Sequence, residues 1–140
     1  MAYRVYLVDD DRFLLDLYAV KFKNAGHEIT GFGSGEDLIA ALHKKDAHAP
    51  DAILLDLIMP GMGGFAALEA MRKEQLAPNT KIIILSNQGQ DSDIEKAKEL
   101  KADGYIVKAS AIPSEVLAET LRIVGGGAAI AAPPSASGEK

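Results

Sequence analysis

Short apolar runs alternate along this chain with longer stretches in which apolar residues recur every three or four positions. The short runs are typical of β-strands. They predict strands at residues 5–8, 28–32, 52–57, 81–85 and 105–107. Gly31 weakens the second of these. The Ile run at 82–84 is typical of a strand that is buried on both faces.

The stretches between the strands predict helices with one inward face. The residues expected to point inward are Leu14, Leu17, Tyr18 and Phe22; then Leu38, Ala41 and Leu42; then Phe65, Leu68 and Met71; and finally Val116, Leu117, Thr120, Leu121 and Val124. Residues 91–101 form the remaining predicted helix. Gly26 suits a helix C-terminus, Ser34 an N-cap, and Pro113 a first helical turn.

Five strand–helix units within about 120 residues predict an α/β fold with a parallel sheet that has helices on both faces. For such a doubly wound sheet we expect the strand order 2-1-3-4-5. After Val124 the chain becomes GGGAAIAAPPSASGEK. This composition buries too little apolar surface to offset chain entropy. We therefore expect a folded domain at residues 1–124 and a flexible tail or linker at 125–140.

Composition narrows the class of protein. The 140 residues include no Cys and carry a net charge of −5, which argues against a disulfide framework and against direct nucleic-acid binding. No apolar run reaches the roughly 18 residues of a membrane span. The N-terminal residues also lack the features of a signal peptide. The default expectation is a soluble cytoplasmic protein with no membrane partner.

Acidic residues stand where two neighbouring strands of the predicted sheet end. Asp9 and Asp10 follow the first strand, and Asp56 lies near the end of the third. In a doubly wound sheet the carboxyl ends of the strands meet at the ligand-binding edge. Three convergent carboxylates repel one another, and a divalent cation offsets that repulsion. Hard oxygen ligands favour Mg²⁺.

Ser86 and Lys108 follow the fourth and fifth strands. A hydroxyl, an ammonium group, a metal ion and a nucleophilic carboxylate are the components of phosphoryl transfer. The product would be an acyl phosphate on Asp56. Each residue also has an ordinary structural explanation: helix capping for the acids after the first strand, a turn for Ser86 or Asp56, and a solvated surface for Lys108. Their joint placement favours chemistry.

Four motifs together resemble the receiver domain of two-component response regulators, a flavodoxin-like family. They are VDDD at 8–11, LLDLIMPGMGG at 54–64, ILSN at 84–87 and GYIVK at 104–108. The resemblance covers residues 3 to about 124. It implies that Asp56 accepts a phosphoryl group from a sensor histidine kinase or a phosphotransfer protein. The domain would act as a signalling switch rather than a conventional enzyme.

The resemblance also implies residue roles. Mg²⁺ would be held by Asp10 and Asp56 directly, by the backbone carbonyl of Ile58, and by Asp9 through a water molecule. Ser86 would hydrogen-bond the phosphoryl group, Lys108 would pair with it, and Tyr105 would change rotamer as Ser86 moves. The fourth helix, fifth strand and fifth helix would then present a changed surface to a downstream protein, and a homodimer through this face is possible. Tyr105 could equally be an aromatic that only packs.

The sequence departs from the family pattern at several positions. Ala109 replaces the usual Pro after the lysine, so we expect a different loop path there. Gly63 replaces a frequent Asp cap. Ile58 and Gln88 stand at the positions that influence the attacking water in the family. Because the Ile58 side chain cannot hydrogen-bond a water molecule, we predict slow self-dephosphorylation.

The sequence also leaves other functions open. A Mg²⁺-dependent hydrolase with an aspartyl nucleophile usually has a second acid at the position of Ile58. A flavodoxin-like cofactor binder needs a phosphate-binding loop, where this chain has acids. The chain could also be the receiver part of a DNA-binding regulator, or a receiver that acts without phosphorylation. The three residues His27, His43 and His48 show no metal-binding spacing and are expected at the surface.

Overall fold

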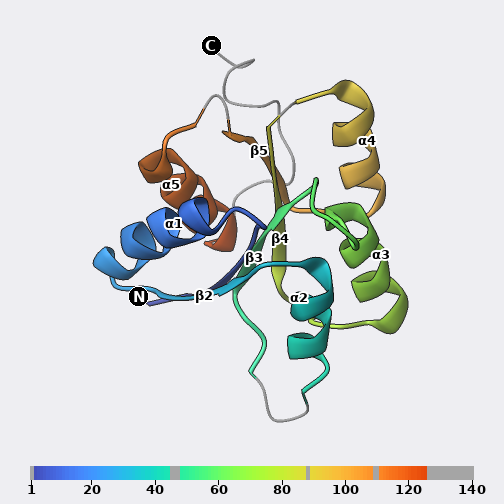
Figure 1. The fold of residues 1–140 in the computed structure, drawn as a ribbon, viewed down its shortest axis with the longest axis horizontal. Helices are drawn as coiled ribbons and strands as arrows, with labels where there is room; N and C mark the ends of the chain where they lie inside the picture. Colours follow the sequence, from blue (N-terminus) through green and yellow to red (C-terminus); the bar gives the residue numbers. More distant parts are fainter. Residues whose placement is uncertain (1, 45–47, 88, 109–110, 126–140) are drawn as a thin grey trace.

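A five-stranded parallel sheet forms the centre of the computed structural model, with the strand order β2-β1-β3-β4-β5 (Figure 1). This confirms the predicted α/β fold. The structure describes residues 2–44, 48–87, 89–108 and 111–125. The elements in chain order are β1 (Arg4–Val8), α1 (Arg12–Asn24), β2 (Glu28–Phe32), α2 (Gly35–Leu42), β3 (Ala52–Asp56), α3 (Gly64–Glu74), β4 (Lys81–Ser86), α4 (Asp91–Glu99), β5 (Gly104–Val107) and α5 (Pro113–Val124).

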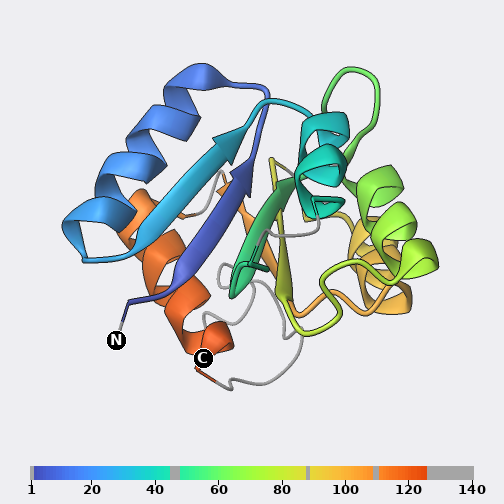
Figure 2. The ribbon, with the colours of Figure 1, turned by 90° about the horizontal axis from the view of Figure 1, so that it is seen from below.

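The helices divide between the two faces of the sheet. Helices α1 and α5 cover one face, and α2, α3 and α4 cover the other (Figure 2). Each face has its own hydrophobic core, called here the α1/α5 core and the α3/α4 core. Along β4, Ile83 and Leu85 belong to the α1/α5 core, whereas Ile82 and Ile84 belong to the α3/α4 core. This alternation explains why the strand reads as a continuous apolar run.

Strand register brings the carboxyl ends of the central strands to one edge. Val8 pairs with Leu55, and Asp56 pairs with Leu85. One strand further, Ser86 pairs with Val107. The residues that follow these pairs therefore leave the sheet side by side.

Side-chain caps fix the start of the first two helices. Asp11 caps α1, because its carboxylate accepts hydrogen bonds from the amides of Phe13 and Leu14 at 3.0 and 3.2 Å. Ser34 caps α2 as predicted, accepting from the amide of Asp37 at 3.1 Å. Such caps satisfy amide groups that have no partner within the helix.

Several packing predictions need correction. Leu17 is 41% exposed, because the inward face of α1 is formed by Leu15, Tyr18 and Phe22. In α5 the buried position near the C-terminus is Ile123, whereas Leu117, Leu121 and Val124 are only half-buried. Helix α4 ends at Glu99, two residues earlier than predicted.

His27 was expected at the surface but is buried. Its Nδ1 accepts a hydrogen bond from the amide of Tyr3 at 3.0 Å, and the two rings stack with centroids 5.7 Å apart. His43 and His48 are exposed as predicted.

The expectations for Gln88, for Ala109 and for the tail after Gly125 lie outside the described residues. Within the described residues, none of the helices combines the length and the apolar character needed to cross a membrane.

Candidate functional site

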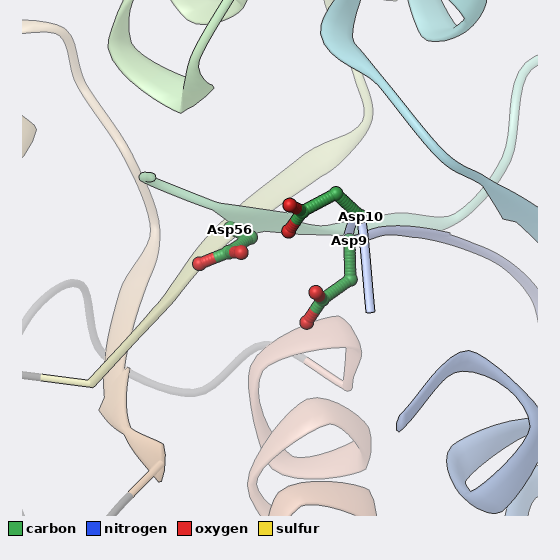
Figure 3. Close-up of side chains that lie close together, drawn as sticks. All are labelled: Asp9, Asp10 and Asp56. Carbon is green, nitrogen blue, oxygen red and sulfur yellow. The ribbon is translucent and has the colours of Figure 1, made fainter. Parts of the chain in front are cut away.

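Three carboxylates converge where β1 and β3 end. Asp9, Asp10 and Asp56 each offer an oxygen, and these oxygens all lie within 4.8 Å of one another (Figure 3). Asp9 and Asp56 are buried, whereas Asp10 is exposed at the mouth of the site. The predicted convergence of these acids is therefore confirmed, and Asp56 lies at the end of its strand rather than in the hydrophobic core.

Lys108 supplies the positive charge that faces these acids. Its Nζ lies 2.7 Å from Oδ2 of Asp9 and 3.4 Å from Oδ1 of Asp56. The other oxygen of Asp9, Oδ1, accepts a hydrogen bond from the amide of Asp11 at 2.9 Å. Both oxygens of Asp9 are thus engaged, as is usual for a buried carboxylate. The link between Asp9 and Lys108 joins residues 99 positions apart in the chain.

The alternation of side chains along the strands places these groups on one side of the sheet. Leu7 and Leu54 belong to the α1/α5 core, and Asp9 and Asp56 follow them by two residues. Ile106 also belongs to that core, and Lys108 follows it by two residues. The charged part of the site is therefore a polar end to the α1/α5 core.

Ser86 and Tyr105 belong to the opposite side of the sheet. Tyr105 packs in the α3/α4 core, and Ser86 follows Ile84 of the same core by two residues. Both residues are buried. A side-chain hydrogen bond joins Ser86 to the Tyr105 hydroxyl, and burial of that phenol raises its pKa. The site thus has a charged part and a hydroxyl part, on opposite sides of the sheet at the same edge.

Burial dominates the electrostatics of Asp56. It raises the pKa of this carboxyl group from 3.8 to about 6, and the negative charge of Asp9 adds to the rise. Lys108 and the backbone amide of Ile58 oppose it, because both stabilise the carboxylate. Burial alone would lower the pKa of Lys108, but its contacts with Asp9 and Asp56 raise it overall. The lysine is therefore charged at neutral pH.

Two glycines allow the chain to turn back against the end of β3. A Cβ on Gly63 would lie 2.7 Å from the carbonyl oxygen of Leu57, and a Cβ on Gly64 would collide with the carbonyl oxygen of Asp56. The amide of Gly64 also donates to the Leu57 carbonyl at 3.1 Å. Gly63 caps α3 without a side-chain hydrogen bond. The glycine pair thus packs the start of α3 directly onto the backbone of Asp56.

The donor set fits Mg²⁺. This ion binds oxygen at about 2.0–2.1 Å, so two oxygens on one ion lie at most about 4.2 Å apart. The oxygens of Asp9, Asp10 and Asp56 all lie within 4.8 Å of one another, which is close enough for these residues to hold one ion together. Asp9 and Asp56 share the ammonium group of Lys108, and Asp10 adds a third carboxylate, so a divalent cation would balance the remaining charge.

All the side chains predicted for the site lie at this edge of the sheet. The predicted role of the Ile58 carbonyl as a ligand remains a prediction; the Ile58 amide bonds to Asp56, and the Ile58 side chain is 77% exposed. Sequence reasoning treated Tyr18 only as a core residue, although it lines a cavity together with Lys108. Tyr18 stands on a helix, and no spacing in the sequence links it to Lys108.

Comparisons with known proteins give the family. The family model described as "Response regulator receiver domain" matches residues 5–121. The chain therefore belongs to the response regulator receiver domain family. This is a family of phosphoacceptor signalling domains in two-component systems, not of conventional enzymes.

Individual relatives agree with this family. The regulatory protein VanRc from Enterococcus gallinarum is 31% identical over 108 residues, which cover 77% of this chain but 44% of VanRc. The chain thus spans less than half the length of this relative. The chemotaxis protein CheY4 from Vibrio cholerae is 25% identical with a TM-score of 0.78, covering 88% of this chain and 99% of that protein. The BeF3-activated receiver domain of DrrB, a Thermotoga maritima response regulator, is 26% identical with a TM-score of 0.74. The match covers 89% of this chain and 99% of that receiver domain.

Proposed function

We propose that Asp56 accepts a phosphoryl group from a phosphohistidine of a sensor histidine kinase or phosphotransfer protein. The observation that carries this proposal is the buried Asp56 carboxylate, within 4.8 Å of Asp9 and Asp10 oxygens and 3.4 Å from the Lys108 ammonium. Asp56 is thereby placed beside an ammonium group that can neutralise an incoming phosphoryl group and beside two acids that can help to hold a cation. The partner class follows from the family.

The proposed transfer is a displacement at phosphorus. A carboxylate oxygen of Asp56 forms the new P–O bond as the P–N bond of the phosphohistidine breaks, and the departing imidazole keeps the electron pair. When bound, Mg²⁺ neutralises charge on the phosphoryl oxygens. We assign its protein ligands as Asp10 and Asp56 directly, Asp9 through water, and the Ile58 backbone carbonyl. Lys108 turns from Asp9 toward the new phosphoryl group and pairs with it.

The hydroxyl part of the site would carry the signal outward. The phosphoryl group brings a charge of about −1.5 to −2 and attracts hydrogen-bond donors. As Ser86 turns toward it, the hydrogen bond between Ser86 and Tyr105 is lost. Tyr105 then repacks, and the surface formed by α4, β5 and α5 changes. A downstream protein, or a second copy of the chain, would bind this surface.

Relatives support parts of this proposal. The DrrB receiver domain is described as BeF3-activated, and we infer that the same phosphoryl analogue activates this chain. We place the receiver domain at residues 1–124, a linker or tail at 125–140, and the protein in the cytoplasm. A second candidate function is the receiver part of a longer transcriptional regulator. It is favoured because the match to this chain covers only 44% of VanRc and 54% of the longer DrrB structure.

Intact-mass measurement tests the central claim. The protein is incubated with Mg²⁺ and a small acyl-phosphate or phosphoramidate donor, and Asp56→Asn is treated in parallel. We expect the wild type to gain the mass of one phosphoryl group and the variant to gain none. Equal labelling of both proteins would exclude Asp56 as the acceptor. Steady release of phosphate from a generic phosphate ester would favour a hydrolase instead.

A further inference from the structure

Tyr18 is a buried residue of α1 that the proposed transfer does not use. Its side chain is only 3% exposed and lies in the α1/α5 core with Leu15 and Phe22. These neighbours have no polar atom in their side chains, whereas Tyr18 carries a hydroxyl group. Asp9, Asp56 and Lys108 form the polar end of the same core, as the alternation along β1, β3 and β5 requires.

An open cavity of about 530 Å³ extends from Tyr18 to Lys108. It lies between α1 and the segment that leads into α5, and both Tyr18 and Lys108 line it. Asn87 adds a third polar group, and Leu14, Ala111 and Ile112 contribute apolar walls. Burial raises the pKa of the Tyr18 phenol. The charges of Lys108 and Asp9 also act on it: Lys108 lowers the pKa and Asp9 raises it.

An ammonium group has three hydrogen-bond donors and no acceptor. Asp9 and Asp56 take up donors of Lys108 at 2.7 and 3.4 Å. Within the proposed function, Lys108 must leave Asp9 when it turns to the phosphoryl group on Asp56. In that arrangement the ammonium loses a carboxylate partner while its side chain remains mostly buried, beside the cavity that Tyr18 lines.

We propose that Tyr18 is a positioning residue for Lys108: its hydroxyl oxygen accepts a hydrogen bond from the ammonium group and holds it toward the phosphoryl group. This inference rests on the proposed function, since it concerns the same site. Without the hydroxyl, Lys108 can turn into the cavity, and the phosphoryl oxygens lose part of their neutralising charge. A hydrogen bond to a charged group is strong enough for this effect to be about tenfold in rate.

The test compares Tyr18→Phe with a matched control, Tyr3→Phe. Phenylalanine keeps the ring that fills the core, so a purely structural role of Tyr18 would be preserved. Tyr3 packs against the same core but stacks on His27, and it is not among the residues of the charged site, so loss of its hydroxyl group should not affect that site. We expect Tyr18→Phe to slow phosphorylation by a small acyl-phosphate donor about tenfold, and Tyr3→Phe to leave the rate within about twofold. A rate for Tyr18→Phe within twofold of the wild type would overturn the proposal.

A double-mutant cycle identifies the residue through which Tyr18 acts. In a Lys108→Met background, Tyr18→Phe should cause no further slowing, because the ammonium group is already absent. Equal slowing in both backgrounds would show that Tyr18 acts independently of Lys108 and would also overturn the proposal.

A measurement without phosphoryl chemistry separates this inference from the proposed function. The side-chain ammonium resonance of Lys108 is followed by ¹⁵N NMR while BeF3 and Mg²⁺ are added to the wild type and to each variant. Lys108→Met provides the assignment. We expect the resonance to shift on addition, and to do so differently in Tyr18→Phe but not in Tyr3→Phe. Identical behaviour in all three proteins refutes the Tyr18 contact. Absence of phosphoryl uptake by the wild type, with the Tyr18-dependent shift retained, refutes only the proposed transfer.

Discussion

At the scale of single residues, the site is built at a cost to stability. Asp56 is a buried carboxyl group whose pKa is raised from 3.8 to about 6. Between these two values the unfolded chain ionises Asp56 more readily than the folded protein does. The free energy of unfolding therefore falls as the pH rises through this interval, and the loss is complete above about pH 6.

This shift predicts that Asp56→Asn stabilises the protein when Mg²⁺ is absent. The gain should be about 1–3 kcal/mol at pH 7 and should be largely lost near pH 4, where the carboxyl group is protonated in the folded protein and only about half ionised in the unfolded chain. Urea unfolding at the two pH values, with a chelator present, measures the difference. Asp16→Asn is the matched control, since Asp16 is an exposed residue of α1. A gain of equal size at both pH values would show that burial of the charge is not its cause.

The exposed side chain of Ile58 governs a second prediction at this scale. It stands two residues beyond the proposed acceptor, is 77% exposed, and has no group that can orient an attacking water molecule. We expect Ile58→Asn to hydrolyse its aspartyl phosphate several-fold faster than the wild type, because an amide can position water. Intact-mass measurement of the phosphoprotein over time gives both rates. If Ile58→Val is accelerated as much as Ile58→Asn, the effect comes from side-chain size and not from hydrogen bonding.

At the scale of helices and strands, the sequence predicts where each element lies in the chain better than which of its side chains face the core. The strand ends were predictable because parallel strands place their carboxyl ends at one edge, and this brought Asp9, Asp56 and Lys108 together. It was harder to predict which face of a helix points toward the core. Leu15 and Leu17 are equally apolar, and only packing against the sheet buries the first and exposes the second. The buried His27 accepts a hydrogen bond from the amide of Tyr3, just before β1, and no local sequence pattern reveals this contact.

Close packing of α3 against β3 predicts a strong effect at Gly64. An added methyl group would collide with the carbonyl oxygen of Asp56, so the strand end and the helix start must separate. We expect Gly64→Ala to lower the free energy of unfolding by about 2–4 kcal/mol and to weaken Mg²⁺ binding. Urea unfolding and calorimetric titration with Mg²⁺ measure the two effects. Gly33→Ala is the control, because no atom lies within 4 Å of its added Cβ. Equal losses in both variants would exclude the proposed collision.

At the scale of the whole molecule, the site joins the two hydrophobic cores. Asp9, Asp56 and Lys108 end the α1/α5 core, whereas Ser86 and Tyr105 belong to the α3/α4 core. Motifs in the sequence identify these residues. They do not show that the residues belong to two different cores, because that depends on which side of the sheet each strand end faces. Under the proposed function, a charge added on the α1/α5 side would therefore act on the helices of the other side through movement of Ser86.

This division predicts where the structure should loosen when the phosphoryl analogue binds. Under the proposed function, Ser86 should turn toward Asp56 when BeF3 and Mg²⁺ bind, and its hydrogen bond to Tyr105 on the α4 side should be lost. Amide hydrogen exchange in α4 and β5 should rise about threefold or more, while exchange in α1 and β2 stays unchanged. Tyr105→Phe should show part of this rise before any addition, because it lacks the hydrogen bond but keeps the ring. Tyr6→Phe, whose ring packs on Phe32, is the control and should behave like the wild type. A rise confined to α1 would mean that the signal leaves the site through the α1/α5 core, and the proposed output surface would then be wrong.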